Sequence, residues 1–194
     1  HTVRKARCWT RRTIKPSQTQ ENLDIKKIFI ALTLLLAVFI CSANIALADG
    51  ASQTAIVLNG NSATVDGVGA SADGSTVTIG QAGTYVLSGE LTNGQILIKA
   101  GKDDQVELVF NGVTIACSTS APVYASKAGL VTITLAEGTV NSLTDASEYA
   151  YAEGEDEPDA TLFSKNDMTI TGTGSLLVTG NFNNGIGPKD DLVI

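Results

Sequence analysis

Beyond Asp49 the sequence contains no histidine and no arginine. Without histidine, this part of the chain can form neither a Ser-His nor a Cys-His nucleophile, and it can build no histidine-based metal site. Without arginine, it has no guanidinium group to clamp a phosphate or a uronate carboxylate. Its glycines stand singly at turn-like positions and form no phosphate-binding loop. These absences argue against catalysis and favour a binding role.

Cysteine is also scarce. Cys8 and Cys41 precede Asp49, so Cys117 is the single cysteine of the remaining chain and an internal disulfide is impossible there. The surrounding sequence VTIACST is typical of a strand and the turn after it. We therefore expect Cys117 to be a small buried apolar side chain rather than a reactive thiol.

The charge divides at the same place. Residues 1–48 hold eight of the thirteen Lys and Arg residues, whereas residues 49–194 hold five lysines and eighteen acids, a formal charge of −13. Such an acidic domain repels nucleic acid and anionic lipid, so we expect no nucleic-acid partner. It tolerates bound cations and can require them.

The first 48 residues have the composition of a targeting segment. Residues 25–48 contain Lys26-Lys27, then the apolar run IFIALTLLLAVFI, then the small-x-small end of Ala46 to Ala48, which are the three parts of a secretory signal peptide. We expect cleavage after Ala48 and a secreted or cell-surface protein. The alternative is an uncleaved membrane helix over residues 28–48, the only membrane contact that we expect. Residues 1–24 show no periodicity and are expected to be unstructured, with no assigned function.

From residue 55 onward, short runs rich in Val, Ile, Leu and Thr alternate with Gly, Asn, Asp and Ser. Typical runs are TAIVL, QILIKA, LVTITL and SLLVTG. No window carries a helical apolar stripe of useful length. The β-branched content and the turn residues predict an all-β fold.

A repeated pattern runs through these strands, in which an apolar residue, Ser or Pro, and Lys precede a turn and a strand. Counted on Lys102, Lys127, Lys165 and Lys189, the intervals are 25, 38 and 24 residues. The longer interval contains NSLTDASEYAYAEGEDEPDA (residues 141–160), which we interpret as an inserted loop. A period in the mid-twenties predicts a right-handed parallel β-helix, a solenoid. Asn-Gly pairs are hairpin signals, so a β-sandwich of the jelly-roll type is the alternative.

Stacked coils would turn their apolar positions inward. The sequence stops at Ile194 inside an expected strand, without a polar capping coil, so we expect the domain spanning residues 49–194 to be truncated at its C-terminus. The expected core residues are Val106, Leu108, Leu130, Ile133, Leu162, Met168, Ile170, Leu176, Val178, Ile186, Leu192 and Ile194.

Carboxylates are the functional groups that the sequence offers in quantity. The inserted loop holds Glu153, Glu155, Asp156, Glu157 and Asp159. Asn166-Asp167 and Asp190-Asp191 lie 24 residues apart, so we expect them to stack on adjacent coils. Ca²⁺ takes six to eight oxygen ligands from such residues and from backbone carbonyls. For the loop and for these turns, the alternative is an acidic surface that is only solvated.

Three stretches together are similar to a known family: TYVLSGELTNGQILIKAGKDDQVELVFNGVTI, EGEDEPDATLFSKNDMTITGTGSLLVTGN and NNGIGPKDDLVI. They resemble the bacterial cell-surface carbohydrate-binding family whose fold is like the polysaccharide-lyase β-helix. The resemblance implies an exported, calcium-binding protein that attaches to plant cell-wall polysaccharides such as cellulose and pectic acids, without established catalysis. The calcium-ligand candidates that it supports are Asp156, Glu157, Asp159, Asn166, Asp167, Asn184, Asp190 and Asp191.

For carbohydrate contact we predict Tyr149, Tyr151, Lys165 and Lys189. The two tyrosines flank the acidic loop, and exposed aromatic rings stack on sugar faces, although a tyrosine at a loop base is as often only packing. Two alternatives remain open. A polysaccharide lyase or hydrolase of the pectate-lyase type would need Lys127, Lys165 or Lys189 as its base, and an adhesive solenoid would bind no small ligand.

Overall fold

A computed structural model describes residues 53–194 of the chain. The expectations for residues 1–24 and 25–48 therefore lie outside the described residues. Within 53–194 there is no helix that is long and apolar enough to cross a membrane. The secondary structure consists of strands, so the prediction of an all-β fold is confirmed.

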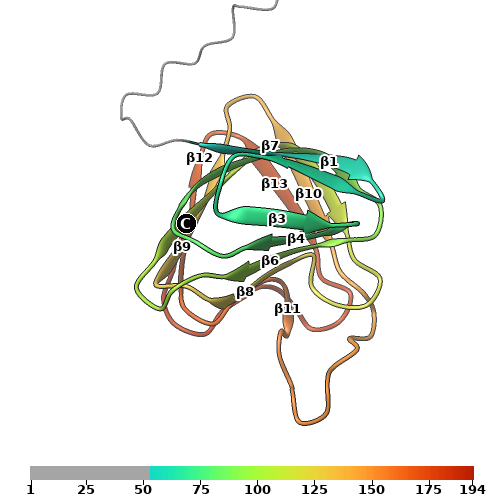
Figure 1. The fold of residues 1–194 in the computed structure, drawn as a ribbon. Coiled ribbons are helices and arrows are strands. Elements are labelled where there is room, and N and C mark those ends of the chain that lie inside the picture. Colours follow the sequence, from blue (N-terminus) through green and yellow to red (C-terminus); the bar gives the residue numbers. More distant parts are fainter. Residues whose placement is uncertain (1–52) are drawn as a thin grey trace, which may run out of the picture. The chain divides into compact units, whose positions relative to one another are not determined.

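The strands form two sheets that share one core. One sheet has nine strands, which are β1 (Thr54–Gly60), β2 (Ala63–Asp66), β5 (Gly83–Leu91), β7 (Gln105–Ala116), β9 (Leu130–Leu135), β10 (Val140–Thr144), β12 (Asp167–Gly172), β13 (Ser175–Thr179) and β15 (Leu192–Val193). The other has six, which are β3 (Ala70–Asp73), β4 (Thr76–Ile79), β6 (Gln95–Lys99), β8 (Val123–Lys127), β11 (Ala160–Ser164) and β14 (Asn184–Pro188). In Figure 1, β1 and β7 lie on one side of the body and β6 and β8 on the opposite side.

Most neighbouring strands are parallel. In the nine-stranded sheet the order is β15-β12-β9-β7-β5-β1-β2, and in the six-stranded sheet it is β14-β11-β8-β6-β4-β3. Only β1–β2 and β3–β4 pair antiparallel within the described residues. A parallel partner must be reached by a crossover, which here runs through the other sheet. From β4 to β9, successive strands therefore alternate between the two sheets, as stacked coils require.

The Asn-Gly pairs explain why the sequence was compatible with both a β-helix and a jelly roll. Asn59-Gly60 does stand at the antiparallel β1–β2 turn, and Gly60 has a φ of 73°. Asn111-Gly112 lies inside β7, where Gly112 has a φ of 76°. Beyond Gly112, β7 pairs with β10 instead of β9. Positive φ favours glycine in both settings, so the dipeptide marks a bend of the chain and not only a hairpin.

The core predictions hold for the middle coils and fail at three positions. Val106, Leu108, Ile133, Leu162, Met168 and Ile170 are buried, and Leu176, Val178 and Ile186 are partly buried. Leu130 is wrong because Val131, with 0% exposure, points inward instead. Leu192, in the edge strand β15, and Ile194, which follows that strand, were expected in the core but are 40% and 82% exposed. Cys117 is buried, as predicted.

The inserted segment is shorter than predicted, because its first residues are a strand. Residues 141–144 belong to β10, with Asn141 and Leu143 fully buried. The Asn141 side-chain oxygen accepts hydrogen bonds from the backbone N–H groups of Gly112 and Val113, both at 3.0 Å. Its amide nitrogen donates to the carbonyl of Ser175 at 3.1 Å. A polar residue at this inward position hid the strand from the sequence pattern, and the loop itself spans residues 145–159.

Candidate functional site

The outer surface of the six-stranded sheet carries a row of lysines. Strands β6 and β8 end at Lys99 and Lys127, which are register partners. The ends of β11 and β14 are also partners, through Ser164 and Pro188, and each is followed at once by a lysine, Lys165 and Lys189. Four of the five lysines beyond Asp49 therefore stand at one edge of one sheet. We call these four residues the lysine row.

The row corrects the repeat as counted on the sequence. Lys102 was expected to be the first member, but the partner of Lys127 is Lys99. The register shifts between Ile98 and Lys99, because Ser126 is an extra residue in β8 at that point. A bulge of this kind changes the spacing between equivalent residues and is not visible in a count of intervals. Lys102 instead lies on an exposed turn beside Asp103, 3.3 Å away.

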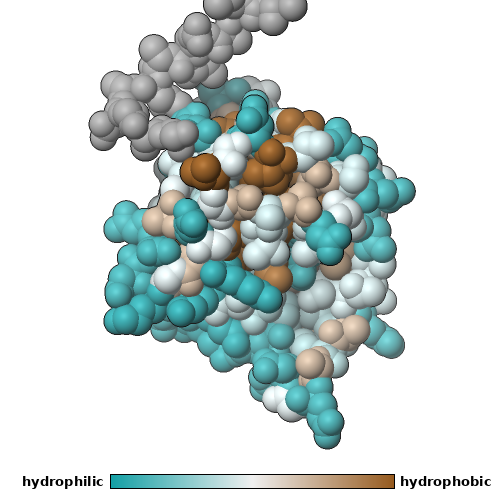
Figure 2. Space-filling model, viewed as in Figure 1, coloured by the Kyte–Doolittle hydropathy of each residue, from teal (hydrophilic) through white to brown (hydrophobic). Residues whose placement is uncertain are grey.

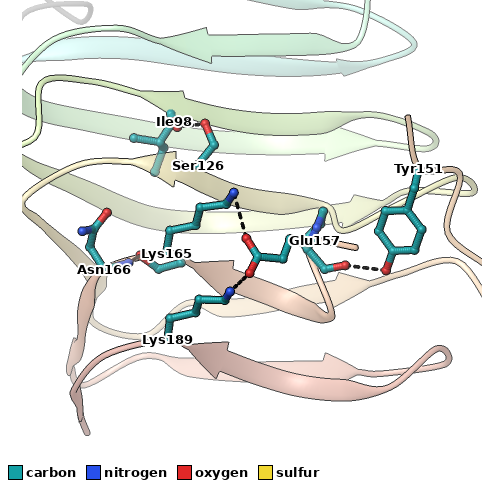
Figure 3. Close-up of polar contacts among 9 residues, drawn as sticks. Ile98, Ser126, Tyr151, Glu157, Lys165, Asn166 and Lys189 are labelled. Carbon is teal, nitrogen blue, oxygen red and sulfur yellow. Dashed lines mark hydrogen bonds and ion pairs between the residues drawn. The ribbon is translucent and has the colours of Figure 1, made fainter. Parts of the chain in front are cut away.

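Glu157 from the loop bridges the last two lysines of the row (Figure 3). One of its carboxylate oxygens lies 2.8 Å from Nζ of Lys165, and the other contacts Nζ of Lys189. The Glu157 side chain is only 10% exposed, whereas those of Lys165 and Lys189 are 35% and 55% exposed. The carboxylate is thus held under the surface by two cations that remain open to solvent.

Next to the row, the outward positions of the same strands are apolar and aromatic. Leu97, Tyr124 and Phe163 are register partners on β6, β8 and β11. The rings of Tyr124 and Phe163 lie 5.7 Å apart at 56° to each other. All five residues of β11 are buried, the outward-facing Phe163 included, so both faces of this strand are covered. Leu97 and Tyr124 stay partly exposed and form a small apolar platform.

A groove runs between this platform and the loop. Its volume is about 400 Å³. The loop, orange in Figure 1, extends beyond the two sheets just before β11, and its tip is hydrophilic in Figure 2. Apolar, amide, ammonium and carboxylate groups all reach the groove, whose lining includes Gln95, Leu97, Lys99, Tyr124, Tyr151, Glu155 and Glu157.

The base of the loop is fixed by a buried carboxylate. Asp145, 4% exposed, accepts hydrogen bonds from the Tyr149 hydroxyl at 2.7 Å and from the Asn181 backbone N–H at 2.6 Å. Burial, and then the hydrogen bond to Asp145, raise the pKa of Tyr149 well above its ordinary value. The Tyr149 ring stacks on Phe182 with centroids 4.4 Å apart. Tyr149 is therefore half-buried, and one face of its ring is occupied.

Tyr151 is the more open of the two predicted tyrosines, with 36% exposure. Its hydroxyl donates to the carbonyl of Pro158 at 2.7 Å, across the neck of the loop. Burial, followed by the nearby charges of Asp159 and Asp156, raises the pKa of Tyr151. Its ring borders the groove and lies 6.1 Å from that of Tyr149. Of the predicted carbohydrate contacts, Tyr151 therefore has the most accessible ring.

The eight predicted calcium ligands do not gather at one point. Within residues 53–194, no three acidic side chains come together as a metal centre. Glu157 is engaged with lysines. Asn166 accepts the Ala128 backbone N–H at 3.3 Å, and Asn184 donates to the Asp159 carbonyl at 3.4 Å. Asp156 is exposed and has no hydrogen bond among the described residues. The set as a whole does not fit one ion.

The expected stacking of the two acidic turns is present. Asp167 and Asp191 precede the paired residues Met168 and Leu192 of β12 and β15. Asp167 accepts a hydrogen bond from the backbone N–H of Asp191 at 3.2 Å. Both carboxylates are exposed, as is Asp190. Two of the predicted ligands thus share one edge, and calcium binding stays a prediction.

The sequence did not single out Lys99, Leu97, Gln95 or Tyr124 as site residues. All four alternate with buried residues in QILIK and VYASK, so their outward direction could have been read from the period of two. The strand alternation does not show which outward face the loop would cover. The covered face depends on the path of residues 145–159, whose acids and glycine follow no periodic pattern.

Comparisons with known proteins agree with one another. Residues 73–194 match the family model described as carbohydrate-binding domain-containing protein. A carbohydrate-binding domain-containing protein of Acetivibrio thermocellus is 39% identical over 181 residues, which are 89% of this chain and 63% of the relative. A solved structure of a polysaccharide lyase-like protein from C. thermocellum, a gadolinium derivative, is 40% identical with a TM-score of 0.71. It covers 73% of this chain, which in turn covers 58% of it.

Proposed function

Because the chain belongs to the family of carbohydrate-binding domain-containing proteins, we propose that it binds polysaccharide of the plant cell-wall type. The binding surface is the outer side of β6, β8, β11 and β14 together with the loop of residues 145–159. We call this surface the loop face. The chain spans 63% of the relative from Acetivibrio thermocellus, so the proposal concerns the described part and not the activity of a longer protein.

The groove beside Tyr124 is the observation that carries the proposal. A sugar ring presents an apolar face of C–H groups and an edge of hydroxyls, and a binding site must match both. Tyr124 and Leu97 supply the apolar floor, and Tyr151 borders the opening. Gln95 and Lys99 line the same groove with hydrogen-bonding groups. A few polar groups placed around an aromatic floor are the usual composition of a ligand site.

The fold that we propose for this part is the predicted right-handed parallel β-helix. Parallel pairing of β6, β8, β11 and β14, each one coil after the last, supports it. A jelly roll would instead be built from antiparallel strands. Likeness to a lyase-like structure with a TM-score of 0.71 points the same way. Export to the cell surface through residues 25–48 is part of the same proposal.

Calcium enters the proposal only at the edge of Asp167 and Asp191. The two aligned, exposed carboxylates offer oxygen ligands, and the rest of a six- to eight-oxygen shell would have to come from water and backbone carbonyls. The lyase-like relative is a gadolinium derivative, and lanthanide ions share the oxygen preference of Ca²⁺. Chelator should lower the Tm of the wild-type chain and leave that of Asp167→Asn unchanged. An equal Tm with and without chelator in the wild type would remove calcium from the account.

Catalysis is not part of the proposal. Of the three lysines that could serve a lyase as its base, Lys165 and Lys189 are engaged with Glu157, whereas Lys127 has no ion pair among residues 53–194. The relatives matched by sequence are described as carbohydrate-binding. An absorbance assay for unsaturated uronate products decides the point, and product formation by the purified chain would favour the lyase alternative.

The binding proposal is tested by sedimentation with insoluble cellulose and by affinity electrophoresis in gels that contain pectic polysaccharide. Tyr124→Ala should lose most of the electrophoretic retardation that the wild type shows in these gels. Thr132→Ala, which lies on the outer face of the other sheet, serves as the matched control and should bind like the wild type. Equal retardation of both variants, or no binding by the wild type to any polysaccharide, would reject the loop face as the site.

A further inference from the structure

The lysine row stands out against the charge of the domain. Residues 49–194 carry eighteen acids and five lysines, and four of those lysines end successive strands of one sheet. Adjacent strands lie about 4.8 Å apart, so the row extends over roughly 14 Å. A domain with this net charge repels polyanions. The row is where four of its five lysines gather, so it is the part of the domain that offers several cations to an acidic ligand.

Glu157 shows how the row binds a carboxylate. It belongs to the loop and not to the sheet, so its side chain approaches the row from above, as a separate ligand would. Its two oxygens divide between Lys165 and Lys189, one to each ammonium (Figure 3). With 10% exposure it is nearly withdrawn from water, while both lysines remain accessible. The chain itself thus supplies the anion that these two cations bind.

The other half of the row lacks such a partner. Among residues 53–194, neither Lys99 nor Lys127 forms an ion pair, and both side chains are exposed. Lys99 and Glu157 line the same groove as Tyr124. A polymer lying on the aromatic floor of this groove would therefore pass from Lys99 toward the carboxylate that Lys165 and Lys189 now hold.

We propose that Lys165 and Lys189 form a carboxylate-binding site, in which Glu157 stands in for a carboxylate of an acidic glycan. An acidic glycan binds by displacing Glu157 and placing its own carboxylates along the lysine row. The inference rests on the proposed function, and it adds the regulation of that site by the loop. Glu157 sets the binding free energy that a ligand must supply in order to displace it. Only a ligand with several carboxylates forms more ion pairs with the row than the two that Glu157 gives up.

The first test compares two neutralised acids of the same loop by isothermal titration calorimetry. The probe is an oligomer of α-1,4-linked galacturonate, with its methyl ester as the uncharged arm. Glu157→Gln should bind the acid form about fivefold more tightly than Glu155→Gln does, the size of one ion pair of about 1 kcal/mol. Both variants remove one negative charge, and Glu155 lines the groove without an ion pair. The difference between their affinities for the acid oligomer therefore measures the competition by Glu157 alone.

Two lysine variants provide the matched loss of function. Lys189→Gln should weaken binding of the galacturonate oligomer severalfold and reduce its dependence on salt. Lys102→Gln changes the one lysine of residues 53–194 that lies outside the row, and it should affect neither. Equal affinities of Glu157→Gln and Glu155→Gln, together with equal effects of the two lysine variants, would overturn the inference while leaving polysaccharide binding intact. Failure of the wild type and of Glu157→Gln to bind either form of the oligomer would also overturn the inference, and failure to bind cellulose as well would reject the proposed function itself.

A second test uses the wild-type chain and so does not depend on the folding of any variant. Hydrogen exchange of the loop is followed by mass spectrometry with and without the acid oligomer. Displacement of Glu157 predicts faster exchange in peptides that cover residues 150–158 when the oligomer is bound, and no change with the methyl ester. Unchanged or slower exchange with bound acid oligomer would contradict displacement.

Discussion

The two sheets are built from the same coils, yet their outer faces differ in chemistry. On the nine-stranded sheet, Glu107 accepts hydrogen bonds from the hydroxyls of Thr84 and Thr134 at 3.0 and 2.7 Å. These are short side chains on neighbouring strands, and no inserted loop meets them. On the six-stranded sheet, the outward positions include the aromatic Tyr124 and Phe163, and the strand ends carry lysines, and residues 145–159 border the same groove.

The difference shows where the coil repeat ends and the site begins. A threonine at an outward strand position is explained by the preference of β-branched residues for strands. Phe163, buried on an outward position, and Glu157, nearly buried near the end of the loop, do need a further explanation. Glu157 is explained by a loop that the repeat does not require, and Phe163 packs against Tyr124 of the neighbouring coil. Function is therefore expected on the face that the insertion modifies, and substitutions can test that division.

The largest effect is expected in the core that both faces share. Phe110 is fully buried on β7, between Leu87 and Leu135 of the adjacent coils. Phe110→Ala should lower the free energy of unfolding by about 4 kcal/mol, through lost transfer energy and a cavity. Val109→Ala, the outward neighbour, is the control and should cost much less. Urea denaturation measures both, and similar costs would mean that the two positions are not on opposite faces.

A smaller effect is expected where only the loop base is changed. Tyr149→Phe removes the hydrogen bond to buried Asp145 and should cost about 2 kcal/mol of unfolding free energy. Because the folded-state pKa of Tyr149 is raised above its ordinary value of 10.0, its contribution to stability is complete below pH 10 and declines as the pH rises further.

Urea denaturation of both proteins at pH 8 and at pH 10.5 checks this sign. The difference in stability between the wild type and Tyr149→Phe should shrink at the higher pH. A difference that is constant or larger at pH 10.5 would contradict the assigned role of the hydroxyl. Loss of polysaccharide binding without loss of stability would place Tyr149 in the binding surface instead of the loop base.

The smallest effect is expected on the outer face of the nine-stranded sheet. Thr134→Val keeps the shape and the β-branching and removes one hydroxyl from Glu107. We expect a change in unfolding free energy within about 0.5 kcal/mol and an unchanged affinity for polysaccharide. Gel retardation and urea denaturation check the two statements. A clear loss of binding would show that the loop face is not the binding surface, or not the whole of it.

The sequence patterns predicted the structural features that repeat from coil to coil. They did not predict the bulge and the loop that interrupt the repeat. The all-β fold, the middle of the core and the stacking of Asp167 on Asp191 follow from strand periodicity. Lys99 was missed because the bulge at Ser126 shifts the count. Leu130 was chosen in place of Val131, although the unbroken alternation of β9 puts Val131 on the same inward face as Ile133. The partners of Glu157 were not predictable, since they depend on the three-dimensional path of an aperiodic loop.

One measurement tests the central claim directly, the location of the polysaccharide site. Backbone amide shifts of the ¹⁵N-labelled chain are recorded during titration with a galacturonate oligomer and with a cello-oligosaccharide. The account predicts shift changes in β6, β8, β11 and residues 145–159. The changes at Tyr124 and at the residues that directly follow each lysine of the row should be among the largest. Changes confined to the outer face of β5, β7 and β9 would contradict it.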